Sequence, residues 1–588
     1  MDIDALIHRL SQCDSSIEEA VTHLASSEPE WEPLIARLSS HLHHEAAQTA
    51  RWQAGAFYTP TQLAHFMVDQ TLPHHFPCLK TAIPDVLDPT CGTGRLLLQA
   101  GERLVKHHGG NAQKAWQLIG PHLHGFDTDP LAIAWLRGRL ISLAGGDVHA
   151  AAHIRHINAL APDALPSMKV DVILGNPPFG SPLRSSHGAA EVRRMGAQML
   201  GIPLGPYIDQ STVFLALASQ SLRPGGHLAM VQPLSMLASR DAESIRTLLS
   251  KSMHFQSAWA SQVFVFDAQV HACVLVLNAS LCTDDVARFG GLPPQTFSRC
   301  APPTPSTWAS LAAPALGVPD LPPIQTSGTI GDHAHATADF RDQYYGLAPA
   351  LESCTRDIPE GAAPILTTGL IDPAHSHWEH RPTRLHKKVW QRPVIHLERL
   401  DDPMQRWAQL RLVPKVILPT QTRALEPFLD LDGRWLPCVP LISITAPTPI
   451  LPGIAALLAS PITALIAMNR HLGTARTPDT IKLSAKAVLE LPWPADQDAM
   501  QTAGIKFRDA QHASTDSARF ESLQEIALLM MDAFSIKGPD RDTLFSWWHD
   551  RLPETSDVFS VCRTSDHRHP QVQAKYNHSR SDNDQGLP

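Results

Sequence analysis

The feature that most constrains this chain is an alternation, between residues 53 and 280, of short apolar runs with longer helical stretches. Strands separated by helices form a largely parallel sheet with helices on both faces. The last two runs are joined by a short link, which predicts one antiparallel strand at an edge of the sheet. The sequence therefore predicts an α/β fold for this region. The candidate strands occupy 85–88, 122–127, 153–158, 170–174, 227–231, 255–259 and 271–277.

The rest of the chain is long enough for further domains, because 588 residues exceed one ordinary domain. A polar, helix-prone segment precedes the α/β region, and a segment rich in Pro, Ser and Thr follows it. A second structured region and an apolar helical pattern come next, and the chain ends on a polar, disordered tail. The predicted units are 1–52 (helical N-terminal segment), 53–280 (α/β domain), 281–350 (linker or irregular segment), 351–495 (second structured domain), 496–552 (helices) and 553–588 (tail).

Composition narrows the class of protein. Hydrophobic residues make up 43% of the chain and charged residues 18%, which is typical of a soluble, well-packed protein. We see no signal peptide. The most apolar segment, Gly453 to Met468, is interrupted by Ser460 and Pro461, so it predicts a buried helix, since a membrane span needs ~20 mostly apolar residues. A cytoplasmic protein with no membrane partner is expected.

Cysteine, histidine and charge exclude other classes. The 9 cysteines include no C-x-x-C pair, which favours reduced thiols over a zinc ribbon. Clusters among the 32 histidines, such as His107-His108, lack Cys or acidic partners, so no metal site is expected. The net charge of −9 argues weakly against nucleic-acid binding by the chain as a whole, but it is compatible with binding in a single basic groove.

The first candidate site is Asp88-Pro-Thr-Cys-Gly92-Thr-Gly94, which follows a predicted strand and opens a helix. Two glycines two residues apart let the backbone turn tightly and approach a ligand. Asp88 can accept a hydrogen bond from an amino group. The pattern predicts either a nucleotide-like ligand or a plain tight turn.

One strand–helix unit later, Gly125-Phe-Asp127-Thr-Asp129-Pro130 places two acidic residues at the end of the second strand. An acid in this position can hold both ribose hydroxyls of a nucleoside. We assign that role to Asp127, because Asp88 and the glycines precede it at the right distance. Asp129 is predicted to cap the next helix, with Pro130 in its first turn.

The most informative motif is Asn176-Pro177-Pro178-Phe179, at the end of another predicted strand. Two prolines make a rigid turn without backbone donors, so the carbonyls remain free to accept. The Asn176 side chain adds a second acceptor. Two acceptors on one planar amino group can aim its lone pair at an electrophile, while Phe179 offers a stacking face.

Together these motifs resemble the N6-adenine DNA methyltransferases of restriction-modification systems, in the gamma-type order in which a methionine-binding motif comes first. That motif is Gly55-Ala-Phe-Tyr-Thr59-Pro60, upstream of Asp88, and the resemblance covers about residues 53 to 280. It implies a Rossmann-like class I methyltransferase fold, S-adenosyl-L-methionine as cofactor, and adenine N6 in double-stranded DNA as target, reached by base flipping. It leaves open a separate restriction endonuclease or specificity subunit.

The resemblance also implies individual roles. Thr59 contacts the carboxylate of the cofactor; a helix N-cap with Pro60 in the first turn is the alternative, and the two roles are compatible. Asn158 stands where the family commonly has Asp and accepts from the adenine amine of the cofactor. Phe266 helps enclose the flipped base, with core packing as the alternative. Methyltransferases that act on guanine N2 of RNA or on protein glutamine use a similar turn and remain the alternative function.

Recognition of DNA is expected outside the methyltransferase fold. The segment from His375 to Arg423 is rich in basic residues and carries Trp378, Trp390 and Trp407 among them. This pattern suits phosphate contacts, although a solvated face would look similar. We take Arg381, Arg384, Lys387 and Lys388 as the candidate DNA-binding residues; the other basic residues are Arg392, Arg399, Arg406, Arg411, Lys415 and Arg423.

Overall fold

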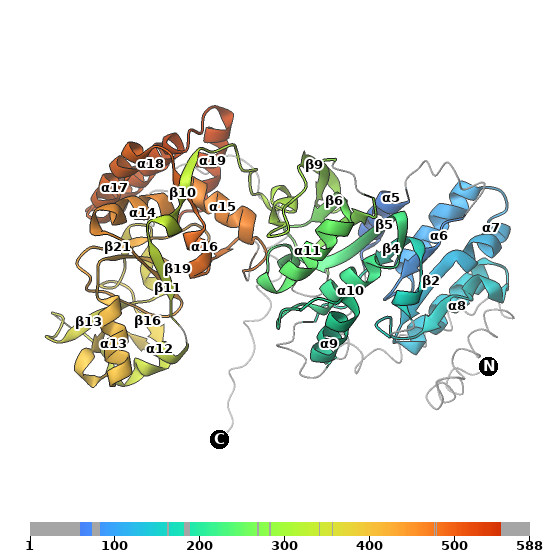
Figure 1. Cartoon of the computed structure of the whole chain (residues 1–588), viewed down its shortest axis with the longest axis horizontal. Helices are drawn as coiled ribbons and strands as arrows, with labels where there is room; N and C mark the ends of the chain where they lie inside the picture. The colour runs from blue at the N-terminus through green and yellow to red at the C-terminus, as the bar shows by residue number, and fades with distance from the viewer. Residues whose placement is uncertain are drawn as a thin grey trace, which may run out of the picture.

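The computed structural model describes residues 59–72, 83–161, 164–180, 188–266, 270–280, 284–339, 341–355, 357–475, 477 and 479–553. The helical segment predicted for 1–52 lies outside these residues, as does the predicted tail from 554 onward. Figure 1 shows two lobes, an N-terminal lobe drawn blue to green and a C-terminal lobe drawn yellow to red.

The N-terminal lobe is built on a nine-stranded sheet with the order β3-β2-β1-β4-β5-β7-β6-β8-β9. The pairs β1–β2, β2–β3, β1–β4 and β4–β5 are parallel. The predicted α/β sheet is confirmed, and each of the seven candidate strands corresponds to one of its strands. They are β1 (Val86–Asp88), β2 (Leu123–Asp127), β3 (Ile154–His156), β4 (Val170–Gly175), β5 (Leu222–Pro233), β6 (His254–Ala260) and β7 (Ala272–Asn278).

The position predicted for the antiparallel strand is wrong. Strand β7 runs antiparallel to both β5 and β6 and lies between them, inside the sheet. Its neighbour β6 is not an edge either, because β8 (Val286–Gly290) pairs with it in parallel and β9 (Gln295–Cys300) pairs with β8. The sheet thus continues into the predicted linker, past residue 280.

Helices cover both faces of this sheet. Neighbouring residues of β4 point to opposite sides, as the pleat requires: Val172 and Leu174 belong to the core beneath α5 to α8, and Ile173 to the core beneath α10 and α11. The helices are α5 (Thr61–Thr71), α6 (Arg95–His108), α7 (Ala112–Ile119), α8 (Pro130–Leu143), α9 (Gly188–Leu200), α10 (Gln210–Ser219) and α11 (Glu243–Ser252).

The Pro-rich segment after β9 is packed against the sheet rather than being a free linker. Arg246 of α11 is buried and donates hydrogen bonds to the carbonyls of Pro305, at 3.1 Å, and Ser306, at 2.8 Å. Burial lowers the pKa of Arg246 to about 10. A buried guanidinium needs several acceptors, which backbone carbonyls supply here. Trp308 is also buried and meets Phe255 edge-on, with ring centroids 4.6 Å apart.

The C-terminal lobe contains two four-stranded sheets, with the orders β11-β23-β19-β21 and β12-β18-β13-β22, and several short pairs. Its strands are β10 (Thr326–Thr329), β11 (His335–Ala338), β12 (Leu351–Ser353), β13 (Ala362–Leu366), β14 (Ile371–Asp372), β15 (His375–Ser376), β16 (Thr383–Leu385), β17 (Lys388–Trp390), β18 (Pro393–His396), β19 (Lys415–Pro419), β20 (Gln421–Thr422), β21 (Phe428–Asp430), β22 (Leu436–Pro437), β23 (Leu441–Thr445), β24 (Ile481–Lys482) and β25 (Pro492–Pro494).

Helices complete this lobe, and the range predicted to be helical, 496–552, contains the last three. They are α12 (Arg341–Gly346), α13 (Asp402–Arg411), α14 (Leu451–Leu458), α15 (Pro461–His471), α16 (Ala485–Leu489), α17 (Gln497–Gln511), α18 (Asp516–Ala533) and α19 (Pro539–His549).

The single buried helix predicted from Gly453 to Met468 is two helices. Ser460 caps α15 and Pro461 occupies its first turn, so the chain must break there. The pair Thr448–Leu458 and Pro461–His471 bends by 66° and is the one stretch of the described chain with enough length and apolar character for a membrane span. No single described helix meets that criterion, and the residues of this pair are mostly buried in the core.

Helix α15 also joins the lobes. The Thr307 hydroxyl donates to the carbonyl of Arg470 at 2.9 Å, and the Asn469 amide donates to the carbonyl of Pro319 at 3.3 Å. One hydrophobic cluster runs from the catalytic sheet through this junction to α17 and α18. The C-terminal lobe is therefore held against the sheet through packed side chains.

Candidate active site

The predicted site residues gather at one edge of the large sheet. Parallel strands end at a common edge, where ligands of such sheets bind. Asp88 ends β1, Asp127 ends β2, and Asn176 directly follows β4. Strand β6 runs in the same direction as β5, since both are antiparallel to β7, and Phe266 follows it.

The glycine turn between β1 and α6 is shaped by both glycines. Gly92 and Gly94 have φ of 50° and 83°, a region that favours glycine. A Cβ on Gly94 would lie 2.2 Å from a methyl carbon of Leu136, whereas a Cβ on Gly92 would meet no atom within 4 Å. Helix packing thus accounts for Gly94, while Gly92 faces open space in which a ligand could approach the backbone.

Asp127 holds this turn in place. Its carboxylate accepts hydrogen bonds from the backbone amides of Gly92, at 2.8 Å, and of Asp129, at 2.9 Å. Burial raises the pKa of Asp127, and these two bonds oppose that effect. Each carboxylate oxygen has a further lone pair, so the predicted ribose contact is compatible with this geometry.

Asp88 is almost fully buried at 2% exposure. Its carboxyl group accepts the amide hydrogen of Thr90 at 3.0 Å. Burial raises its pKa to about 8, the Thr90 bond lowers it, and the nearby charge of Asp127 raises it. A strongly shifted carboxyl group among predicted ligand contacts is typical of a functional site.

The remaining predicted cofactor contacts have local structural roles as well. Asp129 caps α8, accepting from the amides of Leu131 and Ala132, so the capping prediction is confirmed. Thr59 is buried, but the N-cap of α5 is Pro60, so the alternative that Thr59 caps this helix is wrong. The exposed Asn158 accepts the amide of Leu160 at 3.0 Å.

The predicted catalytic turn leads directly out of β4. Pro177 is buried, while Asn176, Pro178 and Phe179 are partly buried. The ring of Phe179 lies edge-on to Phe266, with centroids 6.3 Å apart and an interplanar angle of 80°. Phe266 is buried in the same core, so it packs against the turn whether or not it also contacts a base.

Two residues beside this turn, one bonded to it and one bonded to α10, escaped the sequence analysis. Asp209 caps α10 through Ser211 and also accepts the amide of Gly180 at 3.4 Å, which links the turn to the helix. Burial raises the pKa of Asp209, and the hydrogen bonds from Ser211 and Gly180 oppose it. Gln232, at the end of β5, is fully buried and donates to the carbonyl of Ser211 at 3.1 Å. The cap signal before Gln210 was present in the sequence, whereas its contact with Gly180 was not.

The candidate DNA-binding residues belong to the C-terminal lobe, whereas the edge that gathers the other site residues belongs to the sheet of the N-terminal lobe. Arg381, Arg384, Lys387 and Lys388 are all exposed. Other members of the basic stretch are not available for DNA. Lys415 is fully buried against Asp430 at 2.5 Å, Arg411 pairs with Asp339 at 2.6 Å, and Trp378 and Trp407 are buried.

The edge of the sheet fits the cofactor implied by its motifs. S-adenosyl-L-methionine combines a nucleoside with a cationic sulfonium and an amino acid. The carboxyl groups of Asp88 and Asp127, an open glycine turn and the hydroxyl of Thr59 offer hydrogen-bond partners to such a molecule. Within the described residues, no group of three or more His, Cys, Asp and Glu side chains is placed to hold a metal ion.

The fold and this edge define a Rossmann-like class I S-adenosylmethionine-dependent methyltransferase domain. Residues 39–288 match the family described as N-6 DNA Methylase. The cofactor of this domain is S-adenosyl-L-methionine.

Two curated relatives are similar over about a third of this chain. Type II methyltransferase M.BanIII of Aneurinibacillus aneurinilyticus is 28% identical over 213 residues, or 34% of each chain. Type II methyltransferase M.VspI of Vibrio sp. (strain 343) is 26% identical over 211 residues, which cover 36% of this chain and 44% of the relative. This chain thus spans less than half of either relative.

Among solved structures, the Type IIL restriction-modification enzyme MmeI in complex with DNA is similar over both lobes. The alignment covers 88% of this chain and 78% of that chain, with a TM-score of 0.53 and 12% sequence identity. At this identity the likeness concerns the fold alone.

Proposed function

We propose that this protein methylates adenine N6 at specific sites in double-stranded DNA, as the modification activity of a restriction-modification or related defence system. One observation carries the proposal. The Asn176-Pro177-Pro178-Phe179 turn leaves β4 at the edge that holds Asp88 and Asp127, and its aromatic ring meets Phe266. A site whose oxygens can accept hydrogen bonds from a planar amino group thus adjoins the candidate cofactor site.

The residues of the turn would act by positioning. The target amine is stacked inside a duplex, so its base must first be rotated out, at a cost of a few kcal/mol. The side-chain carbonyl of Asn176 and the backbone carbonyl of Pro177 would accept the two amine hydrogens and fix the direction of the nitrogen lone pair. Phe179 would stack on the base. When bound, S-adenosylmethionine supplies the methyl group. Holding the reactants in line provides most of the rate.

The cofactor contacts extend along the same edge. Asp127 would hold the ribose hydroxyls and Asp88 an amino group. Gly92 would allow a close backbone approach beside Gly94. Thr59 would contact the carboxylate, and Asn158 would accept from the adenine amine. In this arrangement Asp127 serves both the ligand and the turn that surrounds it.

DNA is favoured over RNA guanine or protein glutamine by the similar proteins. Two of them are Type II methyltransferases, and MmeI, a restriction-modification enzyme, was solved in complex with DNA. The recognition surface would lie in residues 351–495, with Arg381, Arg384, Lys387 and Lys388 facing the DNA. A restriction endonuclease or a specificity subunit could act beside this chain as a separate protein.

The test is transfer of a tritiated methyl group from S-adenosylmethionine to duplex DNA, to structured RNA and to a glutamine-containing peptide. We expect label in DNA alone, recovered as N6-methyladenine at one sequence motif when the modified DNA is sequenced. The Asn176→Ala variant should lose transfer yet bind cofactor with wild-type affinity by isothermal titration. Label in RNA or peptide, or more than a tenth of wild-type transfer by the variant, would contradict the proposal.

A further inference from the structure

The β16–β17 hairpin of the C-terminal lobe has an unusual turn. Leu385 pairs with Lys388, so the loop has two residues, His386 and Lys387. Both are in the left-handed region, with φ of 50° and 65°. Two-residue loops of this kind match the twist of a hairpin, but their central positions strongly favour asparagine, aspartate and glycine.

The neighbouring structure holds this turn in its strained conformation. The backbone amide of His386 donates to the hydroxyl of Tyr344 at 2.9 Å, and the two rings lie 4.3 Å apart. At the base of the hairpin, Trp390 donates its indole hydrogen to the carbonyl of Leu385 at 3.0 Å. Leu385 is buried in the core of the lobe. The backbone of the tip, which carries the side chains of His386 and Lys387, is thus held rigidly. Strained backbone of this kind is concentrated at functional sites.

The exposed surface of the hairpin is basic with an apolar component. Arg384, Lys387 and Lys388 are exposed, and Arg381 lies just before the first strand. Val389 is 69% exposed, and the nearby Tyr345 is 59% exposed. A two-stranded ribbon fits the major groove of DNA, where lysine donates to guanine and apolar groups contact the thymine methyl.

We infer that the β16–β17 hairpin enters a groove of the DNA, with Lys387 at its tip, beside His386, reading base edges and Arg384 and Lys388 holding the flanking phosphates. This inference rests on the proposed function and adds to it the element that sets sequence preference. If the hairpin contacted only phosphates, cations on its strands would be sufficient. Glycine at the two tip positions would then form the turn without strain. The His386 ring packs on Tyr344, whereas Lys387 is exposed, so a lysine kept at this position against the strain indicates that its side chain is used.

The test separates the tip from the strands. The His386→Gly/Lys387→Gly pair removes both tip side chains and suits positive φ. It loses the ring contact with Tyr344 but keeps the backbone hydrogen bond from residue 386 to the Tyr344 hydroxyl, so the hairpin keeps its turn. The Arg384→Ala/Lys388→Ala pair is the matched control, since it removes two polar side chains from the strands of the same hairpin. For each protein, methyl transfer is measured on the motif found for the wild type and on duplexes with one base pair changed. Binding is titrated at several salt concentrations.

The glycine pair should lose about ten-fold of the discrimination between the motif and at least one altered duplex, since a base contact is worth about that factor. The alanine pair should weaken binding to all duplexes alike and lower the log–log salt slope by about 0.9 for each phosphate that is no longer neutralised. If the glycine pair keeps wild-type discrimination while it methylates DNA, the inference is overturned. A wild-type protein that leaves all DNA unmethylated overturns the proposed function itself, whatever the hairpin does.

Discussion

The carboxylate of Asp127 accepts the backbone amide of Gly92 at 2.8 Å, so the last residue of β2 holds the glycine turn that follows β1. The two segments are 35 residues apart in the chain. One side chain thereby fixes the open backbone at Gly92 and presents its remaining lone pairs along the same edge. Loss of this carboxylate should weaken nucleoside binding in two ways, because it removes hydrogen-bond acceptors for the ligand and releases the backbone at Gly92.

The Asp127→Ala variant should therefore bind S-adenosylmethionine more weakly. A charge-assisted hydrogen bond contributes roughly 1.5–3 kcal/mol, so the dissociation constant should rise by about 10- to 100-fold. Isothermal titration measures this directly. Asp129→Ala is the control, because Asp129 caps α8 on the same loop. An unchanged dissociation constant for Asp127→Ala would assign the ribose contact to another residue.

The pKa of Asp88 makes stability depend on pH. Because burial raises it to about 8, the folded protein keeps a proton that the unfolded chain releases near pH 3.8. Stability from this group is complete below pH 3.8 and is lost as pH rises toward 8, by about 1.4 kcal/mol per unit. Asp88→Asn should remove this loss. The urea midpoint of the variant, measured relative to that of the wild type, should therefore rise between pH 5 and pH 8. A constant offset between Asp88→Asn and the wild type would refute the assignment.

Local signals explain what could be predicted from the sequence. Apolar runs located the seven strands, and because Asp88, Asp127 and Asn176 stand at strand ends, their meeting at one edge followed from parallel order. Contacts between distant segments explain what could not. The hydrogen bonds from Arg246 to the Pro-rich segment, and the pairing of β8 with β6, depend on tertiary packing. The β16–β17 turn lacks the Asn-Gly pair that marks such hairpins in a sequence.

The link between Asp209 and Gly180 predicts a positioning role in catalysis. Asp209→Ala removes a helix cap, at about 1 kcal/mol of stability, and frees the turn that carries Asn176. The rate of methyl transfer at saturating cofactor should fall by about ten-fold or more, since small displacements of reacting groups are costly. Cofactor affinity should not change.

Two further variants isolate that role. Asp209→Asn keeps an acceptor and a good cap, so it should restore most of the rate. Asp496→Ala removes the corresponding cap from α17, in the C-terminal lobe, and should lower stability without lowering the rate. Equal rates for Asp209→Ala and Asp496→Ala would show that Asp209 acts on stability alone.

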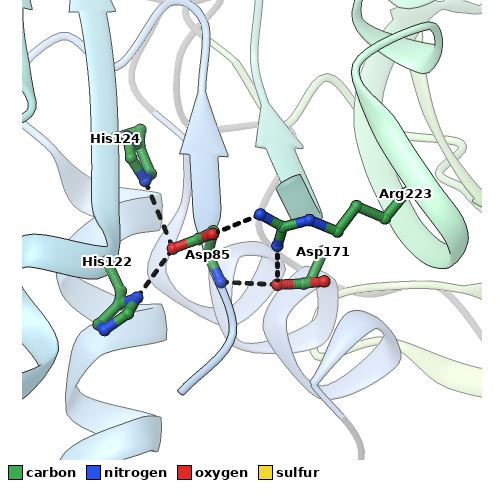
Figure 2. A network of polar contacts seen from close by, with 5 residues as sticks. All are labelled: Asp85, His122, His124, Asp171 and Arg223. Carbon is green, nitrogen blue, oxygen red and sulfur yellow. Dashed lines mark hydrogen bonds and ion pairs between the residues drawn. The ribbon is translucent and has the colours of Figure 1, made fainter. Parts of the chain in front are cut away.

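A polar network at the opposite edge of the sheet predicts a different pH dependence (Figure 2). Arg223 bridges Asp85, at 2.8 Å, and Asp171, at 2.6 Å, and His122 contacts Asp85 at 2.8 Å. These residues lie at the beginnings of β5, β1, β4 and β2, so the network ties four neighbouring parallel strands together. Although burial acts to raise the pKa of Asp85, hydrogen bonds from His122 and Arg223 bring it below its ordinary value of 3.8.

Because the folded-state pKa of Asp85 is depressed, its contribution to stability is complete above pH 3.8 and is lost as pH falls through the folded-state value. Arg223→Ala should destabilise the protein by about 1–2 kcal/mol, a modest amount because solvent screens a side chain that is 42% exposed. In urea unfolding, the deficit should be equal at pH 7 and pH 5 and should shrink below pH 3.8. Arg240→Ala, an exposed arginine in the same lobe, should have no effect at any of these values. A deficit for Arg223→Ala that persists undiminished in acid would mean that the arginine acts through packing of its side chain, and that its charge contributes nothing to the stability of this edge.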